Sequence, residues 1–288
     1  MSRTGGRTRP CGILEGSMRP DAGSIASPPV ALCLGGWDAS GGAGLVRDLL
    51  TVAAFGLHPM AISTAETLQN GEGCQGVSAP LTSPVHHLQL LEPHLAGAVW
   101  GAKWGLVSLP EPWLRDLVAA FASMAPRARI WDPVRAPTVG AAVHDAQTYR
   151  RLAERVLGAG GWVVAPNRLE AACLAGVGPE AAPEAMARPW LDLGAEAVWL
   201  KGGHAEGDRV EDLWITPTET QGLGVHARLP GERRGTGCAV ASAWLALRLL
   251  GQEPKCAAQG AAAWLRDRWN AGFRPGAIGR PVLPPGRP

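Results

Sequence analysis

The sequence predicts an α/β fold in which a mostly parallel sheet lies between two layers of helices. Short apolar runs alternate with longer amphipathic runs from residue 29 to about residue 270, and this alternation is typical of parallel strands joined by crossover helices. Hydrophobic residues make up 46% of the 288 residues, enough for a sizeable core. Proline-rich linkers are absent between residues 29 and 275, so we expect one domain there rather than two.

In the first half of the chain, continuous apolar runs predict buried strands, and apolar residues three and four positions apart predict helices. Residues 30–34 form such a run and close on Gly35 and Gly36, so we expect a strand. Leu45, Leu49 and Val52 share one face of an expected helix over residues 45–55. The same criteria predict strands at 59–63, 98–104 and 128–134, and helices at 86–95 and 112–124.

The second half of the chain continues this alternation. We expect helices at 146–157, 183–193, 237–250 and 254–269, and parallel strands at 162–165 and 197–201. Residues 210–216 and 224–229 are expected to pair as antiparallel strands. Asn167 and Glu170 have the spacing of a helix N-cap and its capping-box partner, which predicts a further helix start.

Composition and charge argue against several classes of protein. The net charge of +2 removes the usual electrostatic argument for a nucleic-acid partner. The sequence contains no run of about 18 apolar residues, so we expect no membrane partner. Only 18% of the residues are charged, which disfavours a long coiled coil or an acidic disordered chain.

The ends of the chain and its cysteines bear on location. Residues 1–28 contain arginine, glycine and proline but no apolar segment of a signal peptide, so we expect a disordered leader, with Met18 as an alternative start. The six cysteines include no C-x-x-C pair, and reduced thiols in a cytoplasmic protein are expected. Residues 276–288 are expected to form a loop or a frayed end.

Two glycine-rich turns each lead into a predicted helix. They cover residues 35–44 and 234–238. Backbone N–H groups without side chains, at the partly positive N-terminus of a helix, can bind phosphate. Neither turn matches a Walker A loop, so an ordinary tight turn is the alternative interpretation of each. Cys238 lies at the start of the second helix, a position that lowers a thiol pKa. It could be a base, a nucleophile or a core residue.

Polar residues follow several predicted strands, at the carboxyl edge where open α/β sheets bind ligands. Lys201 could offer a charge to phosphate, and lysine is rare here, with three lysines against 24 arginines. Asp132 also ends a strand. Asn167 and Glu170 offer oxygen ligands that suit Mg²⁺, unless they form only a capping box. Gln69 could bond the edge of a heteroaromatic ring, or it could belong to an Asn-Gly turn.

Taken in order, these segments resemble the hydroxymethylpyrimidine/phosphomethylpyrimidine kinases of thiamine biosynthesis, in the ribokinase-like superfamily. The resemblance covers about residues 29–270. It rests on the motifs Asp38-x-Ser-Gly-Gly-Ala-Gly44 with Asp48, Gln69-Asn70, Asp132-Pro-Val134, Pro166-Asn-x-x-Glu170, Lys201-Gly-Gly-His204 and Gly235-Thr-Gly-Cys238.

The resemblance implies a ribokinase-like three-layer α/β/α fold, commonly a homodimer, that uses ATP and Mg²⁺. It implies transfer of the ATP γ-phosphoryl group to the hydroxymethyl oxygen of 4-amino-5-hydroxymethyl-2-methylpyrimidine, and then a second transfer that gives the diphosphate. By position, the implied pyrimidine-binding residues are Gly36, Asp48, Thr67, Gln69, Leu106 and Val134. The implied catalytic residues are the base Cys238, the anion-hole residues Gly235, Thr236 and Gly237, and Lys201. The implied ATP-binding residues are Lys201, Asn167 and Thr236, and the implied Mg²⁺ residues are Glu170, Asn167 and Asp132.

The chain departs from the usual family pattern around the expected ring pocket. Thr67, preceded by Glu66, replaces an apolar residue of the pocket wall, and residues 135–139 lack a usual Lys-Ser pair that bears on the second phosphorylation. Arg234 replaces a common histidine and could bind a substrate phosphate or be solvated. Two other functions therefore remain open: a pyridoxal- or pyridoxine-type kinase, and a ligand-binding or regulatory relative without turnover.

Overall fold

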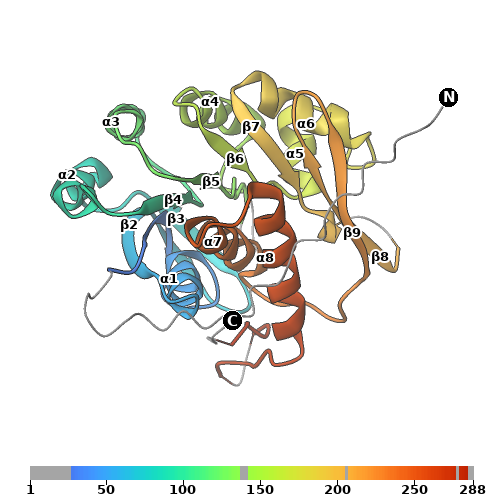
Figure 1. The fold of residues 1–288 in the computed structure, drawn as a ribbon. Coiled ribbons are helices and arrows are strands. Elements are labelled where there is room, and N and C mark those ends of the chain that lie inside the picture. Colours follow the sequence, from blue (N-terminus) through green and yellow to red (C-terminus); the bar gives the residue numbers. More distant parts are fainter. Residues whose placement is uncertain (1–26, 137–141, 205–206, 277–278, 285–288) are drawn as a thin grey trace.

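The computed structural model describes residues 27–136, 142–204, 207–276 and 279–284. In this part of the chain nine strands form one sheet in the order β3-β2-β1-β4-β5-β6-β7-β8-β9 (Figure 1). The pairs from β2 through β1, β4, β5 and β6 to β7 are parallel. Antiparallel pairing is confined to β3 at one edge and to β8 and β9 at the other. The expected mostly parallel sheet is therefore confirmed.

The strands and helices follow one another along the chain as the alternation predicts. The strands are β1 (Val30–Asp38), β2 (His58–Gln69), β3 (Cys74–Ser78), β4 (Trp100–Trp104), β5 (Arg129–Trp131), β6 (Trp162–Val164), β7 (Ala195–Leu200), β8 (Arg209–Ile215) and β9 (Thr220–Ala227). The helices are α1 (Gly44–Ala54), α2 (Pro84–Leu95), α3 (Glu111–Ala122), α4 (Ala146–Leu157), α5 (Arg168–Ala175), α6 (Pro183–Asp192), α7 (Thr236–Leu249) and α8 (Pro254–Trp269).

The helices cover the two faces of the sheet and enclose two separate cores. Helices α1, α7 and α8 pack on one face, and α2 to α6 pack on the other (Figure 1). Strand β1 serves both cores, since Ala31 and Cys33 point into one and Leu32 and Leu34 into the other, as the two-residue period of a strand requires. The layered α/β/α arrangement is thus confirmed.

The structure differs from the expectation most in β2 and β3. Strand β2 was expected at 59–63 but continues to Gln69, where it pairs with the unexpected strand β3. Glu66 and Leu68 in this extension are half-buried and exposed respectively, whereas Ala65 and Thr67 on its other face are buried. Strand β3 has no buried residue. A strand without a buried face lacks the apolar pattern that would predict it.

The last described segment is not a frayed end. Val282 pairs with Phe273 and with Arg234, and the side chains of Val282 and Leu283 are buried. Arg280 N–H donates to the Gly71 carbonyl at 3.2 Å. Residues 279–284 are therefore held against the rest of the molecule. The expected leader falls almost wholly in residues 1–26, which lie outside the described part of the chain.

Two further properties concern location and redox state. No described helix combines the length and the hydropathy of a bilayer-spanning segment. Cys33, Cys74, Cys173 and Cys238 are free thiols, whereas Cys256 is disulfide-bonded, so the expectation of reduced thiols is wrong for Cys256.

Candidate active site

A cleft of about 1820 Å³ lies along the carboxyl ends of the parallel strands. It begins at the ends of β1 and β2, crosses the ends of β4 to β7, and continues between β9 and α8. Every residue that the resemblance implies for the site lines this cleft: Gly36, Asp48, Thr67, Gln69, Leu106, Asp132, Val134, Asn167, Glu170, Lys201, Gly235, Thr236, Gly237 and Cys238. The structure therefore brings the whole set together in one cleft.

The two glycine turns contact each other at the N-termini of α1 and α7. Asp38 organises the first turn, since its Oδ1 accepts from Ser40 N–H at 3.0 Å and its Oδ2 accepts from Ala43 N–H at 2.9 Å. Gly235 is the N-cap of α7 and has a φ of 70°, in the left-handed region. A Cβ atom at Gly235 would collide with the Gly42 carbonyl oxygen. Glycine at this position lets the two turns pack directly on each other.

The start of α7 and Lys201 form a positive region in the cleft. The first residues of α7 present backbone N–H groups that no preceding turn of the helix can bond. The N-cap residue offers no side-chain hydrogen bond to them. Lys201 Nζ lies 3.4 Å from the position that a Cβ on Gly237 would occupy, so its ammonium group is beside these N–H groups. The Asp132 carboxylate lies 3.5 Å from the same position and is paired with Lys201, so an anion placed here would meet the helix dipole and a partly neutralised lysine.

Cys238 behaves differently from the sequence expectation. Its side chain is 9% exposed at the cleft. Burial raises the pKa of this thiol to about 12, while the Lys103 ammonium and a hydrogen bond from the Gly44 backbone act in the opposite direction. The helix start was expected to lower this pKa, and that expectation is wrong because loss of hydration outweighs the helix terminus. Cys238 is therefore a neutral thiol in this state of the protein.

Asp48 is fixed at the base of the cleft by two partners. Its Oδ2 accepts from Lys103 Nζ at 2.8 Å, and its Oδ1 accepts from Ser242 Oγ at 2.8 Å. Burial lowers the pKa of Lys103, but Asp48, Cys238 and Asp132 together raise it by more, so this lysine stays charged. Lys103 was missed as a site residue. The scarcity of lysine, which drew attention to Lys201, applied equally to Lys103.

Asn167 and Glu170 form the capping box of α5. Asn167 Oδ1 accepts from Glu170 N–H at 2.9 Å, and Glu170 Oε2 accepts from Asn167 N–H at 2.8 Å. The pKa of Glu170 is raised to about 7, chiefly by burial, with the Asp132 carboxylate adding to the effect of burial and Lys201 opposing it. The interpretation of this pair as a capping box is confirmed. The hydrogen bond from the Glu170 N–H group occupies the side-chain oxygen of Asn167.

Asp132 has one engaged and one unpartnered oxygen. Its Oδ1 accepts from Lys201 Nζ at 2.6 Å, whereas its Oδ2 is buried and has no hydrogen-bond partner among the described residues. An unpaired carboxylate oxygen beside Glu170 suits a hard cation such as Mg²⁺. The described residues contain no group of three or more His, Cys, Asp or Glu able to hold a metal, so water and phosphate would complete the coordination.

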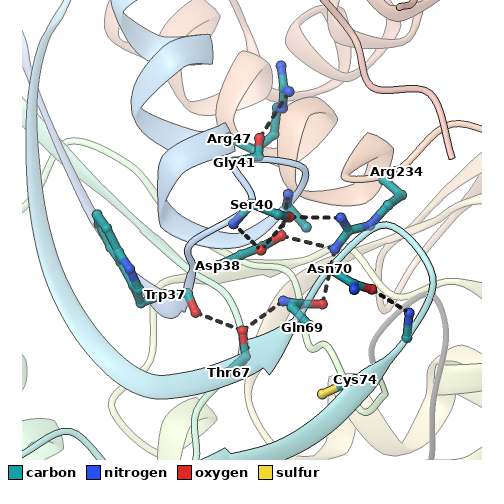
Figure 2. A network of polar contacts seen from close by, with 12 residues as sticks. Trp37, Asp38, Ser40, Gly41, Arg47, Thr67, Gln69, Asn70, Cys74 and Arg234 are labelled. Carbon is teal, nitrogen blue, oxygen red and sulfur yellow. Dashed lines mark hydrogen bonds and ion pairs between the residues drawn. The ribbon is translucent and has the colours of Figure 1, made fainter. Parts of the chain in front are cut away.

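Arg234 lies in a buried polar network at the ring end of the cleft (Figure 2). Its Nη2 donates to Asp38 Oδ2 at 3.0 Å and to Gln69 Oε1 at 3.2 Å, and its Nη1 donates to Ser40 Oγ at 2.9 Å. Its side chain is 4% exposed. The interpretation of Arg234 as a solvated side chain is therefore wrong, because protein acceptors engage both Nη atoms, and the interpretation as a phosphate ligand stays a prediction.

The Gln69-Asn70 motif and the segment after Val134 have local structural partners. Asn70 Oδ1 accepts from the N–H groups of Glu72 and Gly73, so Asn70 forms the expected turn while Gln69 faces the network. Arg135 Nε donates to Cys173 Sγ at 3.1 Å. The expectation about the second phosphorylation rests on residues 135–139, of which residues 137–139 lie outside the described part of the chain.

Comparison with known proteins gives a family match over most of the chain. Residues 38–283 match the family described as phosphomethylpyrimidine kinase. A hydroxymethylpyrimidine/phosphomethylpyrimidine kinase of Synechococcus elongatus is 34% identical over 81% of this chain and 88% of its own length. A protein of the same description from Streptomyces coelicolor is 31% identical over 86% of this chain and 91% of its own length.

Solved structures agree with these matches. The phosphomethylpyrimidine kinase of Clostridium difficile superposes with a TM-score of 0.67 at 26% identity, covering 83% of this chain and 98% of that chain. The pyridoxal kinase of Staphylococcus aureus, solved in complex with AMP-PCP, gives a TM-score of 0.76 at 23% identity, covering 90% of this chain and 94% of that chain. At that identity the pyridoxal kinase shows a shared fold and no more.

Proposed function

Because this chain belongs to the phosphomethylpyrimidine kinase family, we propose that it transfers the γ-phosphoryl group of ATP to the hydroxymethyl oxygen of 4-amino-5-hydroxymethyl-2-methylpyrimidine. It then phosphorylates the monophosphate, in thiamine diphosphate biosynthesis. The chain is a phosphotransferase. The observation that carries the proposal is the contact between the two glycine turns, which puts a phosphate-binding region and a ring-binding region in one cleft.

The phosphate end of the cleft supplies charge stabilisation, which phosphoryl transfer needs more than covalent chemistry. We assign the anion hole to the N–H groups of Gly235, Thr236 and Gly237, and the phosphate-binding cation to Lys201, with Asn167 beside them. Membership of a family described as a kinase supports ATP as the donor. These groups would be preorganised for the charge that develops on the transferring phosphoryl group.

Mg²⁺ fits the oxygen atoms that the cleft provides. The free Oδ2 of Asp132 and the carboxylate of Glu170 would hold it, partly through water, while Asn167 keeps the capping box in place. When bound, Mg²⁺ neutralises charge on the phosphate oxygens that it contacts. The chain's own contribution is to keep Asp132 in position through Lys201.

The ring end of the cleft has polar groups for an aminopyrimidine. Gln69 and Asp48 supply the polar groups, and Gly36, Leu106 and Val134 supply the walls. Cys238, in its thiolate form, is the proposed acceptor of the alcohol proton, and its own proton is released to solvent before the alcohol binds. The Lys103 ammonium and the Gly44 amide are the groups that stabilise its thiolate. Proton transfer late in a loose transition state makes only a modest demand on this residue.

Product analysis by mass spectrometry tests the proposal. The purified protein receives ATP and Mg²⁺ with the hydroxymethylpyrimidine, its monophosphate, or pyridoxal, each offered alone. We expect the monophosphate from the first and the diphosphate from the second. Faster transfer to pyridoxal would assign the chain to the pyridoxal-type kinases. Ring binding without any transfer would identify a regulatory relative.

The remaining expectations belong to the same proposal. We propose that residues 29–275 form the catalytic domain, that the protein acts in the cytoplasm, and that it assembles as a homodimer. Sedimentation equilibrium measures the last of these directly.

A further inference from the structure

The side-chain amide of Gln69 is held at both ends by groups whose donor and acceptor roles are fixed. Its Oε1 accepts from Arg234 Nη2 at 3.2 Å, and its Nε2 donates to Thr67 Oγ1 at 2.9 Å. Thr67 Oγ1 in turn donates its proton to the Trp37 carbonyl at 2.7 Å (Figure 2). The chain of hydrogen bonds therefore runs in one direction from Arg234 to Trp37.

This direction prevents the amide from turning over. A guanidinium group can only donate, so it requires the carbonyl of Gln69 on its side. The Thr67 hydroxyl has given its single proton to Trp37, so it can only accept, and it requires the NH₂ group of Gln69 on the other side. A flipped amide would place donor against donor at Arg234 and acceptor against acceptor at Thr67.

The guanidinium group is itself held rigidly. Arg234 and Asp38 are paired at 3.0 Å with side chains 4% and 0% exposed. A Cβ on Gly42 would lie 2.6 Å from Arg234 Nη1, so the guanidinium packs directly against the backbone of the first turn. Arg234 N–H also donates to the Pro281 carbonyl at 2.9 Å. These contacts fix the position from which Arg234 orients Gln69.

We propose that Arg234 is a positioning residue that sets the specificity of the ring site by locking the Gln69 amide. The inference rests on the proposed function. The locked amide offers a ring one N–H on the Thr67 side and one carbonyl lone pair on the Arg234 side. An aminopyrimidine edge, with an acceptor nitrogen next to a donor amino group, matches this order in one orientation only. A ring without that pair of neighbouring groups, such as pyridoxal, gains nothing from the lock.

A double-mutant cycle tests the proposal. Arg234→Met removes the donors, and Gln69→Met removes the amide. In the presence of Gln69, Arg234→Met is expected to raise the KM for the hydroxymethylpyrimidine about tenfold, the equivalent of one hydrogen bond. The KM for ATP and the KM for pyridoxal should change much less. In the Gln69→Met background the effect of Arg234→Met on the pyrimidine KM should largely disappear.

A second variant tests the hydrogen bond that Gln69 Nε2 donates to Thr67 Oγ1. Thr67→Val removes the acceptor for Gln69 Nε2 without disturbing the buried Asp38–Arg234 pair. It should raise the same KM when Gln69 is present and have little effect in the Gln69→Met background. Because Arg234→Met leaves Asp38 without its cation, it is also combined with Asp38→Asn, and unfolding curves accompany every variant.

The outcomes separate this inference from the proposed function. A wild-type protein that neither binds nor phosphorylates the pyrimidine refutes the proposed function. An active wild type in which Arg234→Met and Thr67→Val have the same effect with and without Gln69 overturns the inference, since both residues would then act only on stability. Equal increases in the KM for pyrimidine and for pyridoxal would also overturn it.

Discussion

Lys103 Nζ lies 2.8 Å from Asp48 Oδ2, and the two side chains are 1% and 0% exposed. Ser242 Oγ donates to the other oxygen of Asp48, so the pair connects β4, α1 and α7 beneath the cleft. A buried ion pair contributes little to net stability as a unit, but an unpaired buried charge is costly. The pair therefore makes the base of the ring site intolerant of single substitutions.

Lys103→Met should lower the free energy of unfolding by about 3–5 kcal/mol, because it leaves Asp48 charged and without its main partner. The double variant Lys103→Met, Asp48→Leu should recover most of that loss. Urea unfolding at neutral pH measures both. A Lys103→Met protein within about 1 kcal/mol of wild type would contradict this prediction and would mean that Asp48 takes up a proton in the variant.

Lys201→Ala should reduce kcat by about 10²–10³, the usual effect of removing one group that stabilises transition-state charge. The affinity for the pyrimidine should change far less, because Lys201 lies at the phosphate end of the cleft. Steady-state kinetics and pyrimidine titration without ATP measure the two effects. Lys255→Ala is the matched control, since Lys255 bonds Gln221 on β9. Unaltered turnover in Lys201→Ala would remove Lys201 from the mechanism.

Alkylation of Cys238 by iodoacetamide should be slow at neutral pH and should rise about tenfold per pH unit from pH 7 to pH 10. The reason is that only the thiolate reacts, and burial raises the pKa of this thiol to about 12. Mass spectrometry of the labelled peptide gives the rate, and Cys238→Ser identifies the peptide. A rate that levels off below pH 8 would instead support the lowered pKa that the helix start predicts.

Removal of Mg²⁺ with EDTA should abolish turnover. Asp132→Asn should raise the Mg²⁺ concentration needed for half-maximal rate about tenfold, because it replaces the one carboxylate whose Oδ2 has no partner among the described residues. Asp116→Asn, an exposed aspartate on α3, is the control. An unchanged Mg²⁺ requirement in Asp132→Asn would place the ion elsewhere.

The fold was largely predictable because its elements bury apolar faces. Helix α4 begins and ends where the periodicity predicts, and β8 and β9 pair as expected. Strand β3 could not be predicted in this way, since its residues are half-buried or exposed and follow no apolar alternation. Its existence depends on hydrogen bonds to β2, which composition does not reveal.

The residues of the site were predictable as a set, but the state of several was not. The order of the motifs predicted that Lys201, Gln69 and Cys238 belong to one site, and all three line the same cleft. The pKa of Cys238 depends on how completely the folded chain excludes water from it, and the partners of Arg234 come from residues 38–40 and Gln69, far away in sequence. Such properties arise only when distant segments meet, so no local pattern records them.

The segment at residues 279–284 has a consequence for how the protein is made. Arg280 bonds Gly71, Pro281 accepts from the backbone of Arg234, and Leu283 accepts from Arg47 Nη1 at 2.7 Å. Every strand and helix of the fold leaves the ribosome before this segment does. A nascent chain can therefore complete its sheet while its ring site is still unfinished, and the final arrangement of both glycine turns forms only after residues 279–284 have been translated.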